Sequence, residues 1–573
     1  MKIHQKRLIT IFDEKPDIVL FDNDVIITNN ASYTESNHRV FYISSSDNLD
    51  KNVTLVQSIQ EMLSMLPGEY QVVNNSIYHM VLRPIVHVLA MLERVIQQEQ
   101  INEIWLFGGS EQVFFTLSHA EGEGTKRLYH SSWLFNPIVN EYFSENKSLK
   151  IVWKKKKIYF SHAMLYWFRE HYNYYRRALG YMGRKLLEGK DHIPIENSNK
   201  KIAILLADLE LQYKHLAKVT EGITSYEKLF ILGRKINPAP EDVVCQLPSL
   251  SVLSTLEILK EIRKARSPKK WIGFQLNGHV IKICAKQIML GSTERLFIAL
   301  YQEKALSRLI QSIGPENIQC VCTNRTMGAD ICYVQNVCKE HELLHVNFQY
   351  VAMQEILYPN MNVADRYYLY SRNVFELYKD YGKQFKYYLP LDKQCFTERN
   401  DQAHRIVIFT QPDAYTDRYL SAIKAILRCF QDNKSQIEII IKLHYRQDKI
   451  ADFVSCERYY SHTKVLTKGN AGEVMNTCDC VISMTSSVLF EALLKGIPTI
   501  ILDFDGLDEP LIKESGVCVP EVNYVVHSPQ EVLELINNYS EFWREYRKRL
   551  EVYLGNNYAQ YYVADELFEA VQM

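Results

Sequence analysis

The sequence predicts an α/β protein with more than one parallel sheet, and three observations support this fold class. Short apolar runs rich in β-branched residues, typical of buried parallel strands, alternate with helical segments along most of the chain. Several runs lead directly into polar residues, as strands do at the ligand-binding edge of open α/β sheets. The alternation also restarts at Lys201, after a polar stretch from Gly189 to Lys200. We therefore expect separate α/β units.

The first unit begins at the N-terminus. Its expected elements are strands at Asp17–Asp22, Arg39–Ser44 and Glu103–Gly108 and a helix at Met80–Gln97. An aromatic-rich helical segment follows at residues 158–188. We expect residues 1–195 to form an N-terminal α/β region with this segment as a helical insertion.

Two further α/β series follow. The first has expected strands at Lys201–Asp208, Lys228–Gly233 and Ile318–Thr323, with helices within 249–311. A turn-rich stretch, Leu389–Ala403, separates it from the second. We expect one Rossmann-like unit at 200–395 and another at 400–573. A single N-terminal lobe over residues 1–395 is the alternative, and the restart at Lys201 favours the division.

Length and composition exclude some classes of protein. A chain of 573 residues is too long for one core, so size alone predicts two to four domains. With 47% hydrophobic and 23% charged residues, the chain has the composition of a folded protein. Lys and Arg number 66 and Asp and Glu 67, which gives a net charge of −1. No overall basic field favours nucleic-acid binding.

The cysteines and the N-terminus indicate a reducing compartment. All twelve cysteines follow residue 244 and none forms a C-x-x-C pair, so we expect reduced core thiols rather than zinc ligands or disulfides. The first residues lack the apolar segment of a secretory signal, and no uncharged stretch approaches the ~20 apolar residues of a membrane span. We therefore expect a cytoplasmic protein.

Polar residues follow an expected strand at Ile437–Leu443. His444 comes directly after this strand, and Lys442 lies two residues earlier on the same strand face. Arg446 adds a second cation. An imidazole can donate to a leaving phosphate, and a Lys or Arg side chain can offset its charge. A solvent-facing polar strand end is the alternative interpretation.

A second strand, Cys480–Met484, leads into hydroxyl-bearing residues. Thr485, Ser486 and Ser487 precede an expected helix that carries Glu491. One hydroxyl is enough to cap a helix, so three predict further hydrogen-bond donors for a phosphate at the helix start. A carboxylate one turn into this helix can accept hydrogen bonds from ribose hydroxyls. Completion of a capping box is the alternative role.

These residues resemble the C-terminal lobe of GT-B glycosyltransferases that build bacterial surface polysaccharides, above all those using CMP-activated acidic sugars and the related CDP-glycerol polymer transferases. The family's Lys-x-His-Pro strand end is similar to Lys442-Leu-His444, although Tyr445 replaces the proline. Its Ser-Ser turn, Glu-Ala helix and Gly-x-Pro match residues 485–498. Ile406–Pro412 resembles the first strand and loop of that lobe.

The resemblance covers about residues 315–525. Upstream, Asn324–Tyr370 is similar to the end of the family's N-terminal lobe, but Gln349-Tyr-Val stands in place of the family's Gln-His-Gly. The resemblance implies a GT-B-like fold, in which two Rossmann-like lobes face a cleft. Residues 400–573 would then bind the nucleotide donor and residues 200–395 the acceptor. The region 1–195 would be accessory or part of the acceptor lobe.

The resemblance also implies a function. The enzyme would move a sugar from a nucleotide donor, such as a CMP-linked Kdo or sialic-acid-like nonulosonate, onto a glycan or lipid-linked glycan of a capsule or lipopolysaccharide. No metal or other cofactor is expected, because helix N-termini and basic side chains stabilise the leaving phosphate. His444 is the candidate catalytic residue on the donor side. The implied donor-binding residues are Lys442, Arg446, Gln411, Thr485, Ser486, Ser487 and Glu491.

The acceptor hydroxyl must lose its proton if the reaction inverts. Asp208 ends the expected strand that begins at Lys201, and it is the best placed carboxylate for this role. Asp330 and Glu111 are weaker candidates. Acidic residues are common at strand ends, so a structural role for Asp208 is the alternative.

Two other classes of protein stay open. A nucleotide-sugar epimerase of the same fold transfers nothing, and a non-catalytic GT-B-like partner would act in a polysaccharide assembly complex. Tyr445 and the absent Gln-His-Gly support the non-catalytic partner.

The basic and aromatic segment Trp153–Arg177 either packs on the core, which we favour, or rests on the cytoplasmic face of an anionic membrane. Asp22-Asn-Asp24 could be a metal-binding D-x-D or the nucleophile of a haloacid-dehalogenase-type phosphatase, but neither interpretation finds its partner motifs. Asp503-Phe-Asp505 could hold a metal, but we favour a strand-end turn near the donor.

Overall fold

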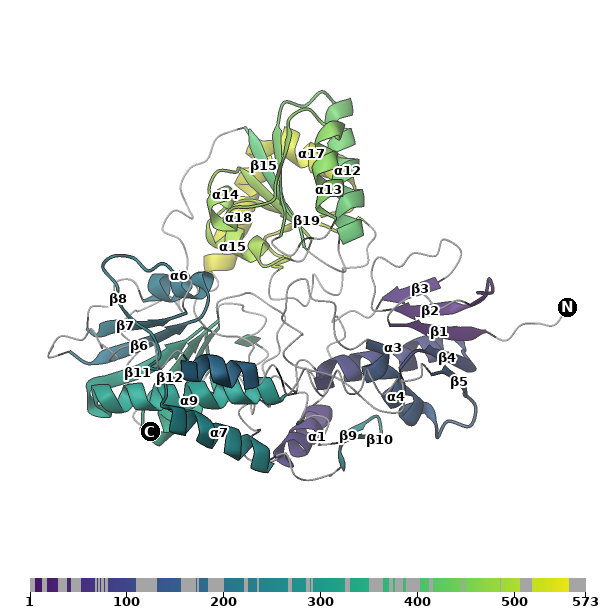
Figure 1. Ribbon diagram of the computed structural model, residues 1–573. Coiled ribbons are helices and arrows are strands. Elements are labelled where there is room, and N and C mark those ends of the chain that lie inside the picture. Colours follow the sequence, from purple (N-terminus) through teal and green to yellow (C-terminus); the bar gives the residue numbers. More distant parts are fainter. Residues whose placement is uncertain are drawn as a thin grey trace. The chain divides into compact units, whose positions relative to one another are not determined.

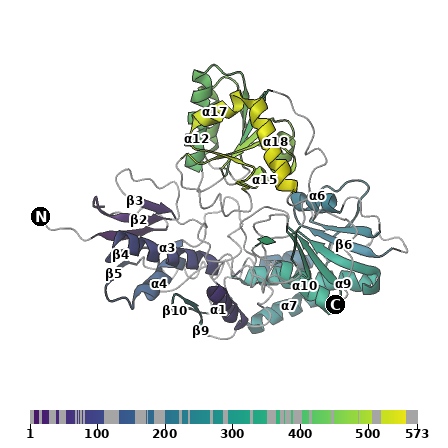
Figure 2. The same ribbon diagram turned by 180° about the vertical axis from the view of Figure 1, so that it is seen from behind.

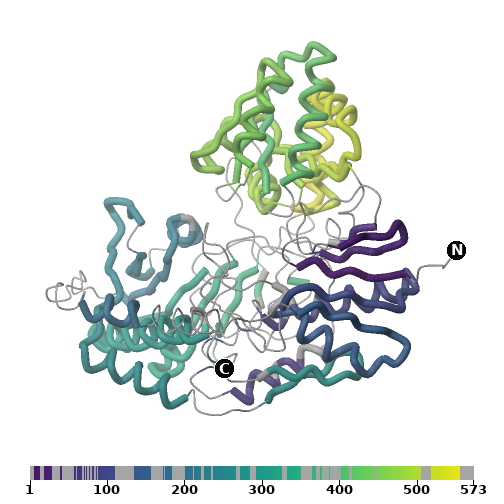
Figure 3. The backbone as a smooth tube through the Cα atoms, turned by 45° about the vertical axis from the view of Figure 1, so that its right-hand side comes forward, coloured from purple at the N-terminus to yellow at the C-terminus, as the bar shows by residue number. Residues whose placement is uncertain are grey.

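The computed structural model of the chain describes residues 6–12, 18–28, 39–42, 53–66, 70, 73, 77, 81–109, 131–155, 172, 175–183, 200–220, 225–233, 236–265, 271–284, 289, 292–324, 330–349, 364–369, 375–376, 385–387, 402–411, 416–444, 447, 449–484, 486–504 and 518–555. The chain forms two compact units. One comprises residues 1–350, 357–367 and 564–573, and the other residues 351–356 and 368–563. The expected boundaries at 195–200 and 395–400 stay predictions. Figure 3 traces the chain by colour from purple to yellow.

The first unit begins with a five-stranded sheet in the order β3-β2-β1-β4-β5 (Figure 1). All of its strand pairs are parallel, as the alternation predicts. The strands are β1 (Arg7–Ile11), β2 (Val25–Thr28), β3 (Arg39–Tyr42), β4 (Glu103–Phe107) and β5 (Lys150–Lys154), and the accompanying helices are α1 (Val53–Ser64), α3 (Arg83–Glu99) and α4 (Ser131–Phe143).

The expected strand at Asp17–Asp22 is wrong. Residues 18–21 are irregular, and the two strands β1 and β2 lie on either side of them. Phe21 is held in a turn instead, because its N–H donates to Asp24 Oδ2 at 2.8 Å. The Arg7 guanidinium donates to Asp24 Oδ1 at 2.8 Å and lies 4.2 Å from the centroid of the Phe21 ring. These contacts satisfy the backbone locally, so the segment joins no sheet.

A seven-stranded sheet in the order β14-β13-β12-β11-β6-β7-β8 also belongs largely to the first unit. The pairs from β12 through β8 are parallel. The strands are β6 (Ile202–Ala207), β7 (Glu227–Leu232), β8 (Val243–Cys245), β11 (Ile318–Thr323), β12 (Leu344–Phe348), β13 (Arg366–Leu369) and β14 (Phe385–Tyr387). The helices are α6 (Glu210–Val219), α7 (Val252–Ala265), α9 (Thr293–Ile313) and α10 (Asp330–Glu340), with a 3₁₀ turn η5 (Pro315–Asn317).

The helices expected within 249–311 are present as α7 and α9, and an antiparallel hairpin of β9 (Trp271–Leu276) and β10 (His279–Cys284) lies between them. Its turn is Asn277-Gly278, and both residues have positive φ, 49° and 82°. Asn-Gly between alternating residues is the strongest short-range hairpin signal, so the sequence does contain this information. The hairpin packs against α1 and α4 of the N-terminal region. The Gln275 N–H, for example, donates to Ser58 Oγ at 2.6 Å.

The second unit contains a six-stranded parallel sheet in the order β17-β16-β15-β18-β19-β20. The strands are β15 (Arg405–Phe409), β16 (Glu438–Lys442), β17 (Thr463–Leu466), β18 (Cys480–Ser483), β19 (Thr499–Leu502) and β20 (Tyr524–Val526). The helices are α12 (Thr416–Asp432), α13 (Ile450–Val454), α14 (Ala471–Met475), α15 (Val488–Leu494), α17 (Pro529–Asn537) and α18 (Tyr539–Gly555), with a 3₁₀ turn η8 (Ser455–Tyr459).

Helices lie on both faces of this sheet (Figures 1 and 2). The apolar stripe of α12, which includes Ile423 and Ile426, packs with α17 against one face of the sheet. Coverage on both sides explains why the central strands are apolar throughout rather than alternating. β18, for example, is buried along its whole length.

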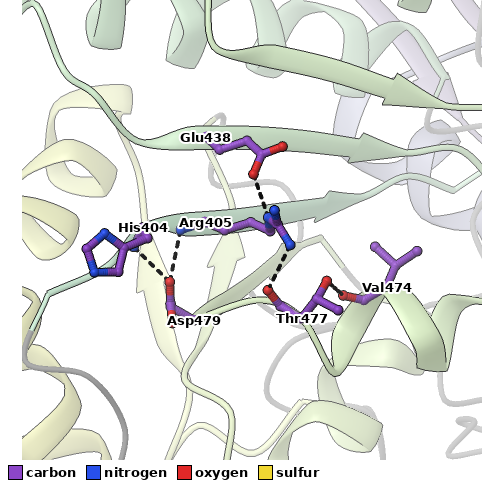
Figure 4. Close-up of polar contacts among 6 residues, drawn as sticks. All are labelled: His404, Arg405, Glu438, Val474, Thr477 and Asp479. Carbon is purple, nitrogen blue, oxygen red and sulfur yellow. Dashed lines mark hydrogen bonds and ion pairs between the residues drawn. The ribbon is translucent and has the colours of Figure 1, made fainter.

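Polar contacts fix the amino ends of the central strands (Figure 4). The Asp479 carboxylate accepts the backbone N–H groups of His404 and Arg405 at 2.7 and 2.9 Å. The Arg405 side chain donates to Glu438 at 2.6 Å and to the Thr477 carbonyl at 3.4 Å. These contacts tie β15 to β16 and to the start of β18. They hold the sheet at the end opposite to its carboxyl edge.

The five-, seven- and six-stranded sheets confirm the α/β fold class, with two Rossmann-like sheets and an additional N-terminal α/β region. A cleft between two facing lobes stays a prediction. In the part of the chain that the structure describes, no helix is long and apolar enough to span a bilayer.

Candidate functional site

The order of strands in the six-stranded sheet identifies its ligand-binding edge. From β15 the chain proceeds outward to β16 and β17, and it then returns to the other side of β15 to form β18. The connections after β15 and β18 therefore diverge at the carboxyl edge. In open α/β sheets, ligands bind at such a topological switch point. Thr410 and Gln411 follow β15, and Ser486 and Ser487 follow β18.

Lys442 is the last residue of β16, next to the switch point. Its side chain is buried at 6% exposure, and its Nζ donates to the Leu443 carbonyl at 2.9 Å. Burial lowers the pKa of this ammonium, because the charged form loses hydration. A single carbonyl replaces little of that hydration, so an anion arriving at this edge would stabilise the charge. This environment fits a phosphate-binding lysine better than a solvent-facing strand end.

His444 lies just beyond β16 and is partly exposed. Its backbone N–H donates to Thr410 Oγ1 at 3.1 Å, which ties the end of β16 to the end of β15. Thr410 in turn donates to Gln447 Oε1 at 2.6 Å, and Gln447 donates to Thr416 Oγ1 at 2.8 Å. The position of His444 is therefore fixed by a chain of buried hydrogen bonds.

The loop after β18 brings Ser486, Ser487 and Glu491 to the same edge. Ser487 is the N-cap residue of α15, but its hydroxyl makes no capping hydrogen bond to the helix backbone. It hydrogen-bonds the Glu491 carboxyl instead, one turn into the helix. The capping interpretation of Ser487 therefore lacks its expected contact. α15 has only seven residues, so hydroxyl groups rather than a long helix would contribute most to binding there.

The Glu491 carboxyl lies one turn into α15 and has a strongly perturbed pKa. Burial raises its pKa from 4.5 to about 7, while Lys495 and the hydrogen bond from Ser487 act in the opposite direction. Close to neutral pH, Glu491 is therefore present in both protonation states. It can donate or accept a hydrogen bond, depending on the group that it meets.

Tyr419, on α12, is a site residue that the sequence analysis missed. Its phenol oxygen accepts the Met484 N–H at 2.9 Å and lies 3.1 Å from Gln411 Oε1 and 2.8 Å from Ser483 Oγ. It thus connects the loops on the two sides of the switch point. The side chain is fully buried in the apolar stripe of α12, so its sequence position indicates only a core aromatic.

The candidate base Asp208 lies in the other compact unit, beyond the end of β6. The seven-stranded sheet has its own switch point between β6 and β11, where the outward order β6-β7-β8 reverses. Asp208 is exposed, and its backbone N–H donates to Gln212 Oε1 at 2.9 Å. A Cβ on Gly233 would lie 2.6 Å from the Asp208 carbonyl oxygen, so the end of β7 needs glycine for this close approach.

The structure therefore brings together Gln411, Lys442, His444, Ser486, Ser487 and Glu491 on one edge of the second unit. Asp208 belongs to the first unit. Thr485 and Arg446 lie outside the described residues. Within the described part of the chain, no cluster of three His, Cys, Asp or Glu residues could hold a metal ion.

No family model and no curated protein matches the chain. Among solved structures, the chain is similar to a glycosyltransferase from Rickettsia africae ESF-5, with 9% identity, a TM-score of 0.37, and coverage of 65% of this chain and 100% of that one. It is also similar to the UDP-GlcNAc 2-epimerase from Methanocaldococcus jannaschii (9% identity, TM-score 0.35, coverage 59% and 92%). A third is S. aureus MnaA with UDP (10% identity, TM-score 0.36, coverage 60% and 90%). At this level of similarity, the assignment of function depends on the site residues.

Proposed function

We propose that this protein is a metal-independent GT-B-type glycosyltransferase that uses a nucleotide-activated sugar donor, and that the donor is a CMP-linked acidic sugar. One observation carries the proposal: Gln411, Lys442, His444 and the Ser486–Ser487 loop occupy the same carboxyl edge, around the switch point of one parallel sheet. These residues also carry the sequence resemblance to transferases of surface polysaccharide synthesis.

In this proposal the donor phosphate lies between the end of β16 and the Ser486–Ser487 loop. Lys442 offsets the negative charge that develops as the sugar departs, and His444 donates a hydrogen bond to the leaving phosphate. The buried position of Lys442 supports this role, because an electrostatic partner acts more strongly where water is excluded. Glu491 accepts from a ribose hydroxyl of the nucleotide.

On the acceptor side, Asp208 would remove the proton of the attacking hydroxyl if the reaction inverts the anomeric centre. Its exposed position at a sheet switch point supports this role. The acceptor would be a glycan or lipid-linked glycan of the cell surface. The reaction forms a glycosidic bond, breaks the bond from sugar to phosphate, and releases the nucleotide.

Product analysis tests the proposal. The protein is incubated with a CMP-linked acidic sugar or a UDP-sugar, each labelled in the sugar, with and without a glycan acceptor. We expect label on the acceptor and free CMP. An isomerised nucleotide sugar in the absence of acceptor would identify an epimerase instead. Transfer from the UDP-sugar alone would overturn the CMP assignment but keep the transferase. Absence of any product would contradict both.

A further inference from the structure

A buried hydrogen-bond centre lies at the carboxyl ends of β15 and β18, next to residues of the proposed donor site. Tyr419 Oη, at 0% exposure of its residue, contacts the Met484 N–H, Ser483 Oγ and Gln411 Oε1 at 2.9, 2.8 and 3.1 Å. Ser483 Oγ also lies 2.9 Å from the Phe409 carbonyl, to which it donates. The centre therefore spans the ends of β15 and β18 and the helix α12.

Proton counting shows that these contacts cannot all be satisfied at once. A phenol has one proton to donate. When Ser483 uses its proton on the Phe409 carbonyl, its Oγ can only accept from Tyr419. Gln411 Oε1 also can only accept from Tyr419. Two acceptors thus compete for one proton, and the loop after β15 can exchange its hydrogen bond with Tyr419 for another donor at little cost.

We propose that Tyr419 is a positioning residue of the donor site. Its hydroxyl holds the Met484 backbone and the Gln411 side chain in place on the two sides of the switch point. When the nucleotide binds, Gln411 Oε1 exchanges the hydrogen bond from Tyr419 for one from an N–H or O–H group of the nucleotide. Tyr419 then donates its proton to Ser483. This inference rests on the proposed function, because it assigns Gln411 to contact with the nucleotide.

The test is a double-mutant cycle of Tyr419→Phe and Gln411→Leu, with CMP and UDP binding measured by isothermal titration calorimetry. Tyr419→Phe keeps the ring and removes only the hydroxyl. We expect it to weaken nucleotide binding about tenfold. If Tyr419 acts through Gln411, then Tyr419→Phe should add much less than tenfold to the loss caused by Gln411→Leu. Full additivity would overturn the coupling.

Tyr460→Phe is the matched control within the same unit. Tyr460 is also buried, and its hydroxyl donates to the Ile437 carbonyl at 2.8 Å, at the amino end of β16. If Tyr419 has only a structural role, the two variants should lower the midpoint of thermal unfolding by similar amounts. Their affinities for the nucleotide should then be equal. Our inference predicts a loss of affinity only in Tyr419→Phe, and equal affinities would overturn it. If the wild-type protein binds neither nucleotide, the proposed function fails and this inference fails with it.

Discussion

At the scale of single residues, Glu491 makes the carboxyl edge around β15 and β18 sensitive to pH. Its folded-state pKa of about 7 lies above the ordinary value of 4.5. The unfolded chain releases this proton more readily, so stability falls as pH rises from about 4.5 through about 7. The loss is at most about 3–4 kcal/mol for a pKa raised from 4.5 to about 7, and less in practice because solvent reaches part of the residue.

Glu491→Gln cannot ionise and should remove this pH dependence. We expect the variant to gain stability relative to wild type above pH 7 and little or none below pH 4.5, measured by urea unfolding across that range. Parallel curves for the two proteins at every pH would contradict the raised pKa.

Substitution of His444 tests the proposed chemical step. Its backbone N–H, not its side chain, makes the contact to Thr410, so His444→Ala should leave the loop in place. We expect turnover to fall on the order of a hundredfold, the usual effect of removing one transition-state donor. The measurement is kcat with the preferred donor, with circular dichroism to verify folding. Near-normal turnover in a folded variant would remove His444 from the mechanism.

The sequence predicts most of these residues but not the one that connects them. Lys442 stands out because it ends an apolar strand, and His444 and the serines stand out because they come shortly after such strands. Tyr419 sits within a helical apolar stripe, where a phenol looks like any core aromatic. Its role depends on the Met484 N–H, which only the fold brings into contact with it.

At the scale of elements, the loop between β18 and α15 allows two roles of its serines to be distinguished, which are capping of the helix and binding of a phosphate. Because Ser487 makes no capping contact, Ser486→Ala/Ser487→Ala should cost less than the ~0.5–2 kcal/mol typical of a lost N-cap. If the hydroxyls hold phosphate, CMP should bind more weakly to the variant while cytidine binds as before. Affinities of both ligands for both proteins provide the comparison. Equal weakening, or none, would contradict the phosphate role.

Strands with strong local signals could be predicted, and elements fixed by tertiary contacts could not. β16 and β18 match their apolar runs. Asp17–Asp22 also has a strand-like composition, but Asp24, held by Arg7, fixes Phe21 in a turn. The β9–β10 hairpin was missed although Asn277-Gly278 marks its turn, because helical periodicity on both sides dominates that region.

At the scale of the whole molecule, the proposed function depends on the order of the strands in the sheets. No local sequence pattern encodes this order. The switch points between β15 and β18 and between β6 and β11 depend on which strands pair. The sequence predicts several α/β units and the resemblance implies their roles. The expected placement of donor on residues 400–573 and acceptor on residues 200–395 stays a prediction.

The central claim is that the edge around β16 and β18 binds the phosphate of a nucleotide. The most direct test is calorimetric titration of the intact chain with CMP, UDP and their nucleosides, for wild type and Lys442→Met. The variant replaces a buried ammonium with an apolar chain of similar length, so the fold should persist or gain stability. We predict that wild type binds at least one nucleotide more tightly than its nucleoside, and that Lys442→Met abolishes this difference. Equal affinity for nucleotide and nucleoside in wild type, or an unchanged difference in Lys442→Met, would contradict the account.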